Sequence, residues 1–120
     1  MNLSNESIEG VDASGMLGDV LAQPLQLGDA LWRAQSAGIR PRDTPAGLVI
    51  CGMGGSAIGG DLAIAALGDR ATRSITVVRG YAIEAWTPPE TMVLCASYSG
   101  ETEETLACFE AAGAAGAERA

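Results

Sequence analysis

Residues 48–57 read LVICGMGGSA, an apolar run that stops at a glycine-rich turn. A short run of this kind is typical of a strand that is buried on both faces of a sheet. The glycines let the backbone turn sharply, and the pattern predicts a helix over residues 56–67 with Ser56 at its N-cap position. A strand, a tight turn and a helix in this order favour a parallel α/β sheet.

The sequence on the C-terminal side continues with further strands and one more helix. Residues 74–78 and 92–96 are two more apolar runs of strand length, and a helix is expected over 103–115. The segment between these two strands carries Pro88 and Pro89 and predicts a loop, so the second crossover lacks a helix. We expect a parallel sheet with right-handed connections and flanking helices. Because the last helix should lead into a further strand, the chain is interpreted as a fragment that is truncated after the third strand.

The N-terminal third has a different character. Residues 1–11 are polar and are expected to form a loose leader, and Asp12 to Ser14 offer N-cap groups for a helix. Pro24 is expected to break or restart that helix, and a second apolar stripe continues to Gly38. The predicted organisation is a leader with N-terminal helices over 1–40, and an incomplete sheet domain over 41–120. The leucine-rich stripe in the helices allows a homodimer contact as the weaker option beside packing on the sheet.

Composition excludes several functions. The net charge is −8, with seven Arg and no Lys or His, so nucleic-acid binding is not expected. Without His or Lys the chain has no Ser-His-Asp triad and no Schiff-base lysine. Cys51, Cys95 and Cys108 are interpreted as small buried residues of a reducing cytoplasm. No apolar run approaches the length of a membrane span, and the N-terminus is not a signal peptide.

The first turn, over residues 52–57, has two readings. Backbone N–H groups at a helix start can cradle a phosphate, with Gly55 supplying backbone and Ser56 a hydroxyl. The same residues also fit the pattern G-x-G-x-x-A of dinucleotide sites. That reading expects an acidic residue at the end of the second strand, where the sequence has Arg79. Arg79 instead suits a 2′-phosphate, so an NADP-binding oxidoreductase fragment stays as an alternative.

The second turn favours a phosphate over a dinucleotide. Ser97, Ser99, Gly100 and Thr102 gather at one strand-to-helix junction. An ordinary N-cap accounts for one hydroxyl but not for three. If the first and third strands are neighbours and the second lies on the other side of the first, both turns face one ligand at the carboxyl edge of the sheet.

Several stretches together resemble a known family. The signature SYSGETEETL at 97–106 resembles the phosphate-binding segment of sugar isomerase (SIS) domains. GMGGSAIGGD at 52–61, DASGML at 12–17 and VRGY at 78–81 extend the resemblance to the N-terminal half of the bifunctional phosphoglucose/phosphomannose isomerases. Glu101 departs from the pattern, because Asn is expected there.

The resemblance implies a flavodoxin-like three-layer sandwich of the SIS type and a full-length enzyme that interconverts glucose 6-phosphate or mannose 6-phosphate with fructose 6-phosphate. It implies that phosphate is held by the hydroxyls and glycines of the two turns, namely Gly55, Ser56, Ser97, Ser99, Gly100 and Thr102. The catalytic base, a Glu, and a ring-opening His are expected beyond Ala120, so no catalytic residue is assigned and the chain alone is expected to be inactive. The resemblance implies neither a metal nor an organic cofactor. A non-catalytic phosphosugar-binding module is the other alternative.

Overall fold

The computed structural model describes residues 4–120 of the chain. They fall into two compact units with a boundary between Arg42 and Asp43. No helix in residues 4–120 combines the length and the apolar character that a bilayer crossing requires.

The first unit begins with a short helix where a loose leader was expected. Helix α1 (Asn5–Glu9) is capped by Ser4, whose Oγ accepts a hydrogen bond from the backbone N–H of Ser7 at 3.3 Å. A serine at this position satisfies one of the N–H groups that a helix start leaves unpaired. The expectation of a loose leader is therefore wrong for residues 5–9, and residues 1–3 lie outside the described part.

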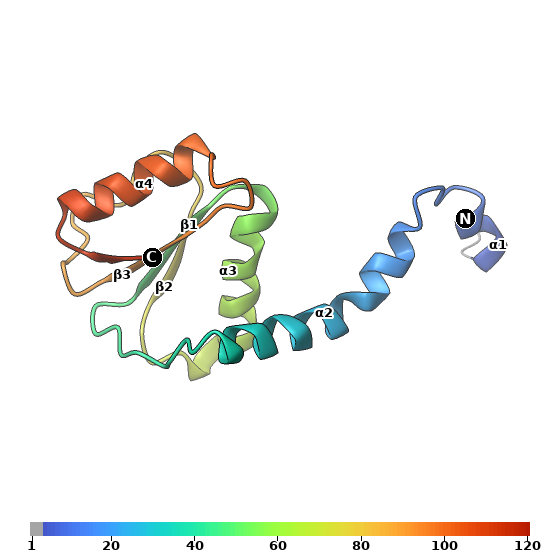
Figure 1. Ribbon diagram of the computed structural model, residues 1–120, viewed down its shortest axis with the longest axis horizontal. Helices are drawn as coiled ribbons and strands as arrows, with labels where there is room; N and C mark the ends of the chain where they lie inside the picture. The colour runs from blue at the N-terminus through green and yellow to red at the C-terminus, as the bar shows by residue number, and fades with distance from the viewer. Residues whose placement is uncertain (1–3) are drawn as a thin grey trace. The chain divides into compact units, whose positions relative to one another are not determined.

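Helix α2 (Met16–Ser36) runs through Pro24 without ending. The expectation that Pro24 would break the helix is therefore wrong. A proline removes one backbone hydrogen bond and crowds the preceding turn, and the ribbon of α2 bends part-way along its length (Figure 1). The Asp12 carboxylate accepts from the N–H groups of Met16 at 2.7 Å and Leu17 at 2.9 Å, which secures the helix start. These bonds lower the pKa of Asp12.

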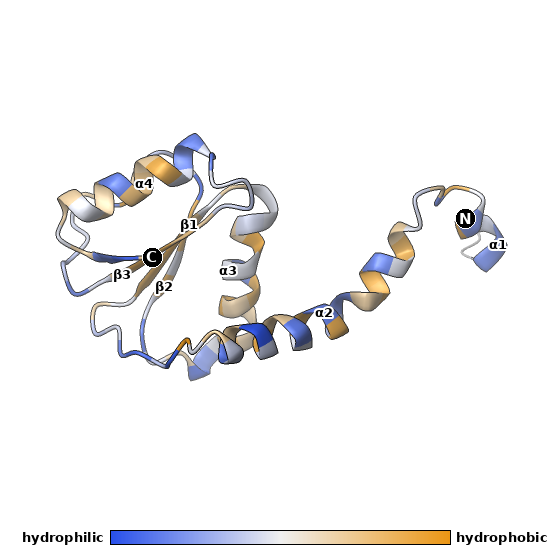
Figure 2. Cartoon of the chain, in the orientation of Figure 1, coloured by the Kyte–Doolittle hydropathy of each residue, from blue (hydrophilic) through white to orange (hydrophobic). Residues whose placement is uncertain are grey.

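Helix α2 has no buried residue. Hydrophobic and hydrophilic residues both occur along its ribbon (Figure 2). The exposed apolar side chains form the stripe noted in the sequence, and they include Leu17, Val20, Leu21, Leu27 and Leu31. The dimer contact suggested for this stripe stays a prediction.

The second unit is built on a parallel sheet, as expected. Its strands are β1 (Leu48–Gly52), β2 (Ile75–Val78), β3 (Met92–Ala96) and β4 (Glu118–Arg119), in the spatial order β2-β1-β3-β4. All three pairings are parallel. The first and third strands are neighbours and the second lies on the other side of the first, which is the arrangement under which both turns were expected to face one ligand.

The fourth strand is the point at which the structure adds to the expected sheet. Three strands were expected within the chain, but β4 follows the last helix and pairs with β3. Ala120 extends this pairing, since its N–H donates to the Val93 carbonyl at 3.0 Å and its carbonyl accepts from the Cys95 N–H at 2.8 Å. The expected number of strands is therefore corrected from three to four, because the backbone of 118–120 already joins the sheet edge.

Helices α3 (Gly54–Leu67) and α4 (Glu103–Ala114) flank the sheet on opposite sides (Figure 1). A 3-10 turn, η1 (Gly68–Arg70), follows α3. Helix α3 packs on β1 and β2, and α4 packs on β1, β3 and β4. No regular element lies between β2 and β3, which confirms the expected crossover without a helix.

The core lies mainly between the sheet and α4. Its fully buried members are Cys51, Val93, Cys108 and Ala112, joined by Ala117. Successive residues of a strand point to opposite faces, so the neighbour of Cys51, Ile50, points toward α3. There the helix approaches closely at Gly60, where an added Cβ would lie 2.7 Å from Val77 Cγ2 and 3.2 Å from Ile50 Cδ1. Glycine at this position lets α3 pack against the sheet.

Candidate phosphate site

The two turns singled out in the sequence lie at the same edge of the sheet. Strand β1 ends at Gly52 and β3 ends at Ala96, and these two residues are register partners. Gly52 is buried, and an added Cβ would come within 3.0 Å of the Ala96 carbonyl oxygen. Any larger residue would push the strand ends apart, so this glycine permits the two turns to adjoin.

The first turn starts its helix earlier than expected. Helix α3 begins at Gly54, with Met53 in the N-cap position and no side-chain cap. Ser56 is therefore the third residue of the helix, and its assignment to the N-cap is wrong. Its N–H donates to the Met53 carbonyl at 3.0 Å. The glycine pair before Ser56 lets the helix start directly after the extended Met53.

Open space adjoins this helix start. An added Cβ at Gly55 would meet no atom within 4 Å, and Gly55 is exposed. The first turn of a helix presents N–H groups without intrahelical partners and the positive end of the helix dipole. At Gly55 no side chain covers the backbone of this helix start, and Ser56 lies next to it.

The second turn holds three hydroxyls together. Ser97 Oγ lies 2.9 Å from Thr102 Oγ1 and 3.5 Å from Ser99 Oγ. Two backbone groups complete the turn, since the N–H of Gly100 donates to Ser97 Oγ at 3.0 Å and that of Glu101 donates to Ser99 Oγ at 3.1 Å. These contacts define the hydroxyl cluster as Ser97, Ser99 and Thr102.

Thr102 occupies the N-cap of α4, but its hydroxyl does not cap the helix. The Thr102 carbonyl accepts from the N–H of Leu106 at 3.0 Å, while Oγ1 turns toward Ser97. An ordinary Ser/Thr cap would direct the hydroxyl to a helix N–H. The Thr102 side chain therefore belongs to the hydroxyl cluster. Gly55 and Ser56 lie in the adjoining turn at the start of α3 and are not members of this cluster.

Carboxylates surround the second turn on its helix side. Glu103 and Glu104 stand in the first turn of α4, where acids are favoured by the dipole. Both raise the pKa of Tyr81, Glu104 more strongly. Tyr81 thus lies near this edge although it was not among the predicted site residues. The sequence feature that could have placed Tyr81 at this edge is its position in the VRGY segment, directly after the second strand.

Arg79 has a partner inside the second unit. Its guanidinium pairs with the carboxylate of Asp61 on α3. The cation at the end of β2 is therefore partly neutralised by a neighbouring helix. A ligand phosphate would have to compete with Asp61 for it.

The three cysteines meet in the core beneath this edge. Cys51 and Cys95 are register partners on β1 and β3, and α4 contributes Cys108. All three are free thiols. Burial, and next the proximity of Cys108, raises the pKa of Cys51, so the thiol stays protonated and is a poor nucleophile. Within residues 4–120 no group of three or more His, Cys, Asp or Glu side chains is arranged to hold a metal ion.

Comparison with known proteins supports the resemblance. The bifunctional phosphoglucose/phosphomannose isomerase of Caldicellulosiruptor bescii is 44% identical to this chain over 70 residues, which is 58% of the chain and 21% of that protein. The bifunctional phosphoglucose/phosphomannose isomerase of Aquifex aeolicus is 46% identical over 67 residues, which is 55% of the chain and 21% of that protein.

The chain therefore spans about a fifth of the length of the curated relatives it matches. No family model matches the sequence, and no solved structure matches it. Over more than half of its residues the chain is similar to bifunctional phosphoglucose/phosphomannose isomerases, and the resemblance inferred from its motifs is confirmed.

Proposed function

We propose that this chain is the phosphate-binding part of a sugar-phosphate isomerase that interconverts glucose 6-phosphate or mannose 6-phosphate with fructose 6-phosphate. The observation that carries the proposal is the hydroxyl cluster of Ser97, Ser99 and Thr102 at the carboxyl end of β3. It adjoins the glycine-rich start of α3, and ligands of open α/β sheets bind at this edge. The names of the two relatives supply the reaction class.

The geometry suits a phosphate in particular. Hydroxyls can donate to phosphate oxygens, and the starts of α3 and α4 add backbone donors and dipoles of the right sign. A protein with net charge −8 can hold such an anion where local donors outweigh its overall field. The phosphate would accept from Ser56, Ser97, Ser99 and Thr102, with Gly55 and Gly100 leaving room for its oxygens.

The isomerisation itself moves a proton between adjacent sugar carbons, and a positioned base is required for that step. The role proposed for this chain is to anchor the phosphate so that the carbons of the sugar are held in place, because orientation lowers the barrier. The base is assigned to the remainder of the full-length protein.

The central test is the Ser99→Ala variant of the full-length protein. A hydrogen bond to a charged phosphate contributes about 1.5–3 kcal/mol, so glucose 6-phosphate should bind roughly 10- to 150-fold more weakly by calorimetry. Ser36→Ala, at the end of α2, is the matched control and should bind like the parent. Unchanged affinity in a folded Ser99→Ala variant would show that the cluster only shapes the turn.

Two alternatives are separated by the same titrations. An NADP-binding fragment should bind NADP better than hexose 6-phosphate, but the pairing of Arg79 with Asp61 speaks against it. A non-catalytic sensor should bind hexose 6-phosphate without converting it. Turnover of glucose 6-phosphate to fructose 6-phosphate by the full-length protein therefore distinguishes the enzyme from the sensor.

A further inference from the structure

The loop that follows β2 is bonded to α4. The Sγ of Cys108 on α4 donates a hydrogen bond to the Gly80 carbonyl at 3.3 Å. Three residues further on, Ile83 packs against the core cluster that includes Cys51 and Cys108. The backbone is therefore held on both sides of Tyr81, so this residue has a defined place although its side chain is 60% exposed.

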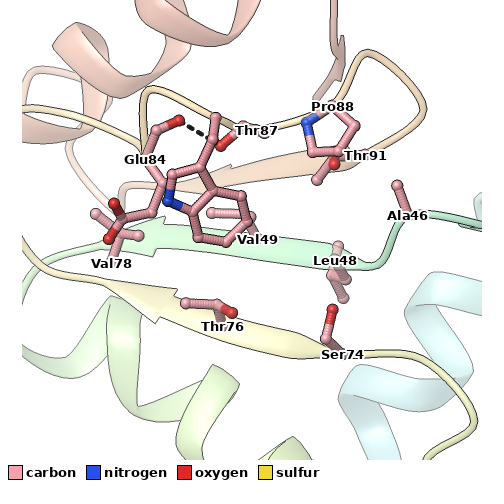
Figure 3. Close-up of a pocket in the computed structure, with 11 residues that line it drawn as sticks. Ala46, Leu48, Val49, Ser74, Thr76, Val78, Glu84, Thr87, Pro88 and Thr91 are labelled. Atoms are coloured by element: carbon pink, nitrogen blue, oxygen red, sulfur yellow. Dashed lines mark hydrogen bonds between the residues drawn. The ribbon is translucent and has the colours of Figure 1, made fainter.

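The same loop continues across the face of the sheet that packs on α4. It passes over the strands that carry Val49 and Thr76, with a cavity of about 150 Å³ between loop and sheet (Figure 3). Val49 belongs to the α4 face, since it packs against the core cluster. The N–H of Thr87 donates to the Glu84 carbonyl at 2.9 Å, which gives this stretch a turn of its own. Tyr81 thus lies where the loop leaves the carboxyl edge of the sheet.

The bond at Gly80 places Tyr81 beside the first turn of α4. Glu104 and Cys108 are four residues apart and therefore share one side of the helix, with Glu104 one turn closer to its start. The Glu104 carboxylate is the first cause of the raised pKa of Tyr81, which agrees with this placement. The same turn follows directly on Thr102, the N-cap residue whose hydroxyl belongs to the hydroxyl cluster. Tyr81 therefore borders the proposed phosphate site on its β2 side.

The chain has two tyrosines, and the structure separates their roles. Tyr98 lies between Ser97 and Ser99 in the sequence, but its side chain is 104% exposed, as in an extended peptide. The hydroxyls of its two neighbours point toward each other at 3.5 Å, and the Tyr98 ring stands clear of them. The tyrosine that is nearest to the hydroxyl cluster in sequence is therefore the less suited to contact a ligand bound there.

A hexose 6-phosphate offers more than its phosphate for recognition. Its sugar body is neutral, with hydroxyl groups and apolar C–H faces, and it extends away from the two turns that would hold the phosphate. A phenol ring can pack on such a face, and its hydroxyl can both donate to and accept from a sugar hydroxyl. The half-buried carboxylate of Glu104 beside Tyr81 accepts hydrogen bonds and repels anions, which suits a neutral group at this place.

We propose that Tyr81 contacts the sugar body of the hexose 6-phosphate whose phosphate is held by the two turns. Tyr81 would then let the site distinguish a phosphorylated sugar from a phosphate ester without a sugar. This inference rests on the proposed function, and it adds a residue that supplies specificity to the residues that supply anchoring.

The test compares glucose 6-phosphate with ethyl phosphate, which has the phosphate ester but no sugar, by calorimetry on the full-length protein. Tyr81→Phe removes only the hydroxyl and should weaken glucose 6-phosphate binding roughly 2- to 10-fold, because one hydrogen bond is lost. Tyr81→Ala also removes the ring and should weaken it further. Neither variant should change the affinity for ethyl phosphate. Tyr98→Ala is the matched control and should bind both ligands like the parent.

Ser99→Ala separates this inference from the proposed function, because it should weaken both ligands by the same factor. If Ser99→Ala changes neither affinity, the phosphate site is wrong. If it weakens both while Tyr81→Ala binds glucose 6-phosphate like the parent, the phosphate site stands and the role of Tyr81 is refuted. That role is also refuted if Tyr81→Ala weakens both ligands equally, or if Tyr98→Ala matches it. Should Tyr81→Ala fail to fold, an unchanged affinity of Tyr81→Phe for glucose 6-phosphate refutes the role instead.

Discussion

Replacing Gly60 by alanine tests how closely α3 packs on the sheet. The added methyl would lie 2.7 Å from Val77 Cγ2, 3.2 Å from Ile50 Cδ1 and 3.4 Å from Ile50 Cβ. Valine is stiff at χ1, so Val77 has little freedom to move aside, and overpacking of this kind costs about 1–3 kcal/mol. Alanine gains about 1 kcal/mol in helix propensity over glycine. We expect a net loss of roughly 0–2 kcal/mol in the free energy of unfolding.

The neighbouring residue supplies the matched control. Gly59 lies in the same helix, and an added Cβ there would meet no atom within 4 Å. Gly59→Ala should therefore keep only the propensity gain and stabilise the chain by about 0.5–1 kcal/mol. The two variants carry the same chemical change one position apart, so their difference isolates the packing of α3 on β1 and β2.

The assay is urea unfolding followed by far-UV circular dichroism, because Trp86 is 77% exposed and its fluorescence would change little on unfolding. With a slope of about 2 kcal/mol/M, which is typical of small proteins, the midpoints of the two variants should differ by about 1 M. A Gly60→Ala midpoint equal to or above that of Gly59→Ala would refute the close approach of α3 to Ile50 and Val77.

Three further outcomes are expected. Asp12→Ala should lower the helical content seen by circular dichroism. Backbone hydrogen bonds lower the pKa of Asp12 in the fold, so its carboxylate stabilises the helix above the ordinary pKa of 3.8, and this stabilisation is lost as the pH falls through the lowered pKa. If the helical content of parent and variant fell in parallel on acidification, the capping role would be contradicted. Cys51 and Cys108, both fully buried, should resist iodoacetamide at neutral pH by mass spectrometry, and labelling as fast as in urea would argue against their burial. Thr91→Val should raise stability by about 1 kcal/mol, since it removes an unpaired hydroxyl; a clear loss of stability would mean that the hydroxyl has a partner.

Much of the second unit could be predicted because its signals are local. The apolar runs at 48–52 and 92–96 have strand length, and each ends at a turn with its own chemistry. Three hydroxyls within six residues, Ser97 to Thr102, must lie close together wherever that turn sits. Their contacts of 2.9 and 3.5 Å follow from this spacing, whereas their binding role stays a proposal.

Other features could not be predicted, because they depend on distant parts of the chain. Strand β4 is Glu118–Arg119, two charged residues without any apolar pattern. It is a strand because the free edge of β3 offers hydrogen bonds to its backbone. The cavity between the loop over residues 84–91 and the strands β1 and β2 likewise depends on where that loop crosses the sheet. Neither the loop nor the strands have a sequence pattern that predicts it. Pro24 suggested a break, but one lost hydrogen bond does not outweigh the remainder of a 21-residue helix.

The hydroxyl of Ser97 has a consequence for how this turn can change over time. The same oxygen holds the turn together, through Gly100 and Thr102, and faces the proposed ligand site. A substitution there would alter both the shape of the turn and its recognition at once. Single substitutions are therefore a difficult route to a new ligand specificity in this turn. We expect its residues to be kept together or to change together. Gly55, which borders open space, is free of that constraint, so we expect the α3 side of the site to be the one that diverges one residue at a time.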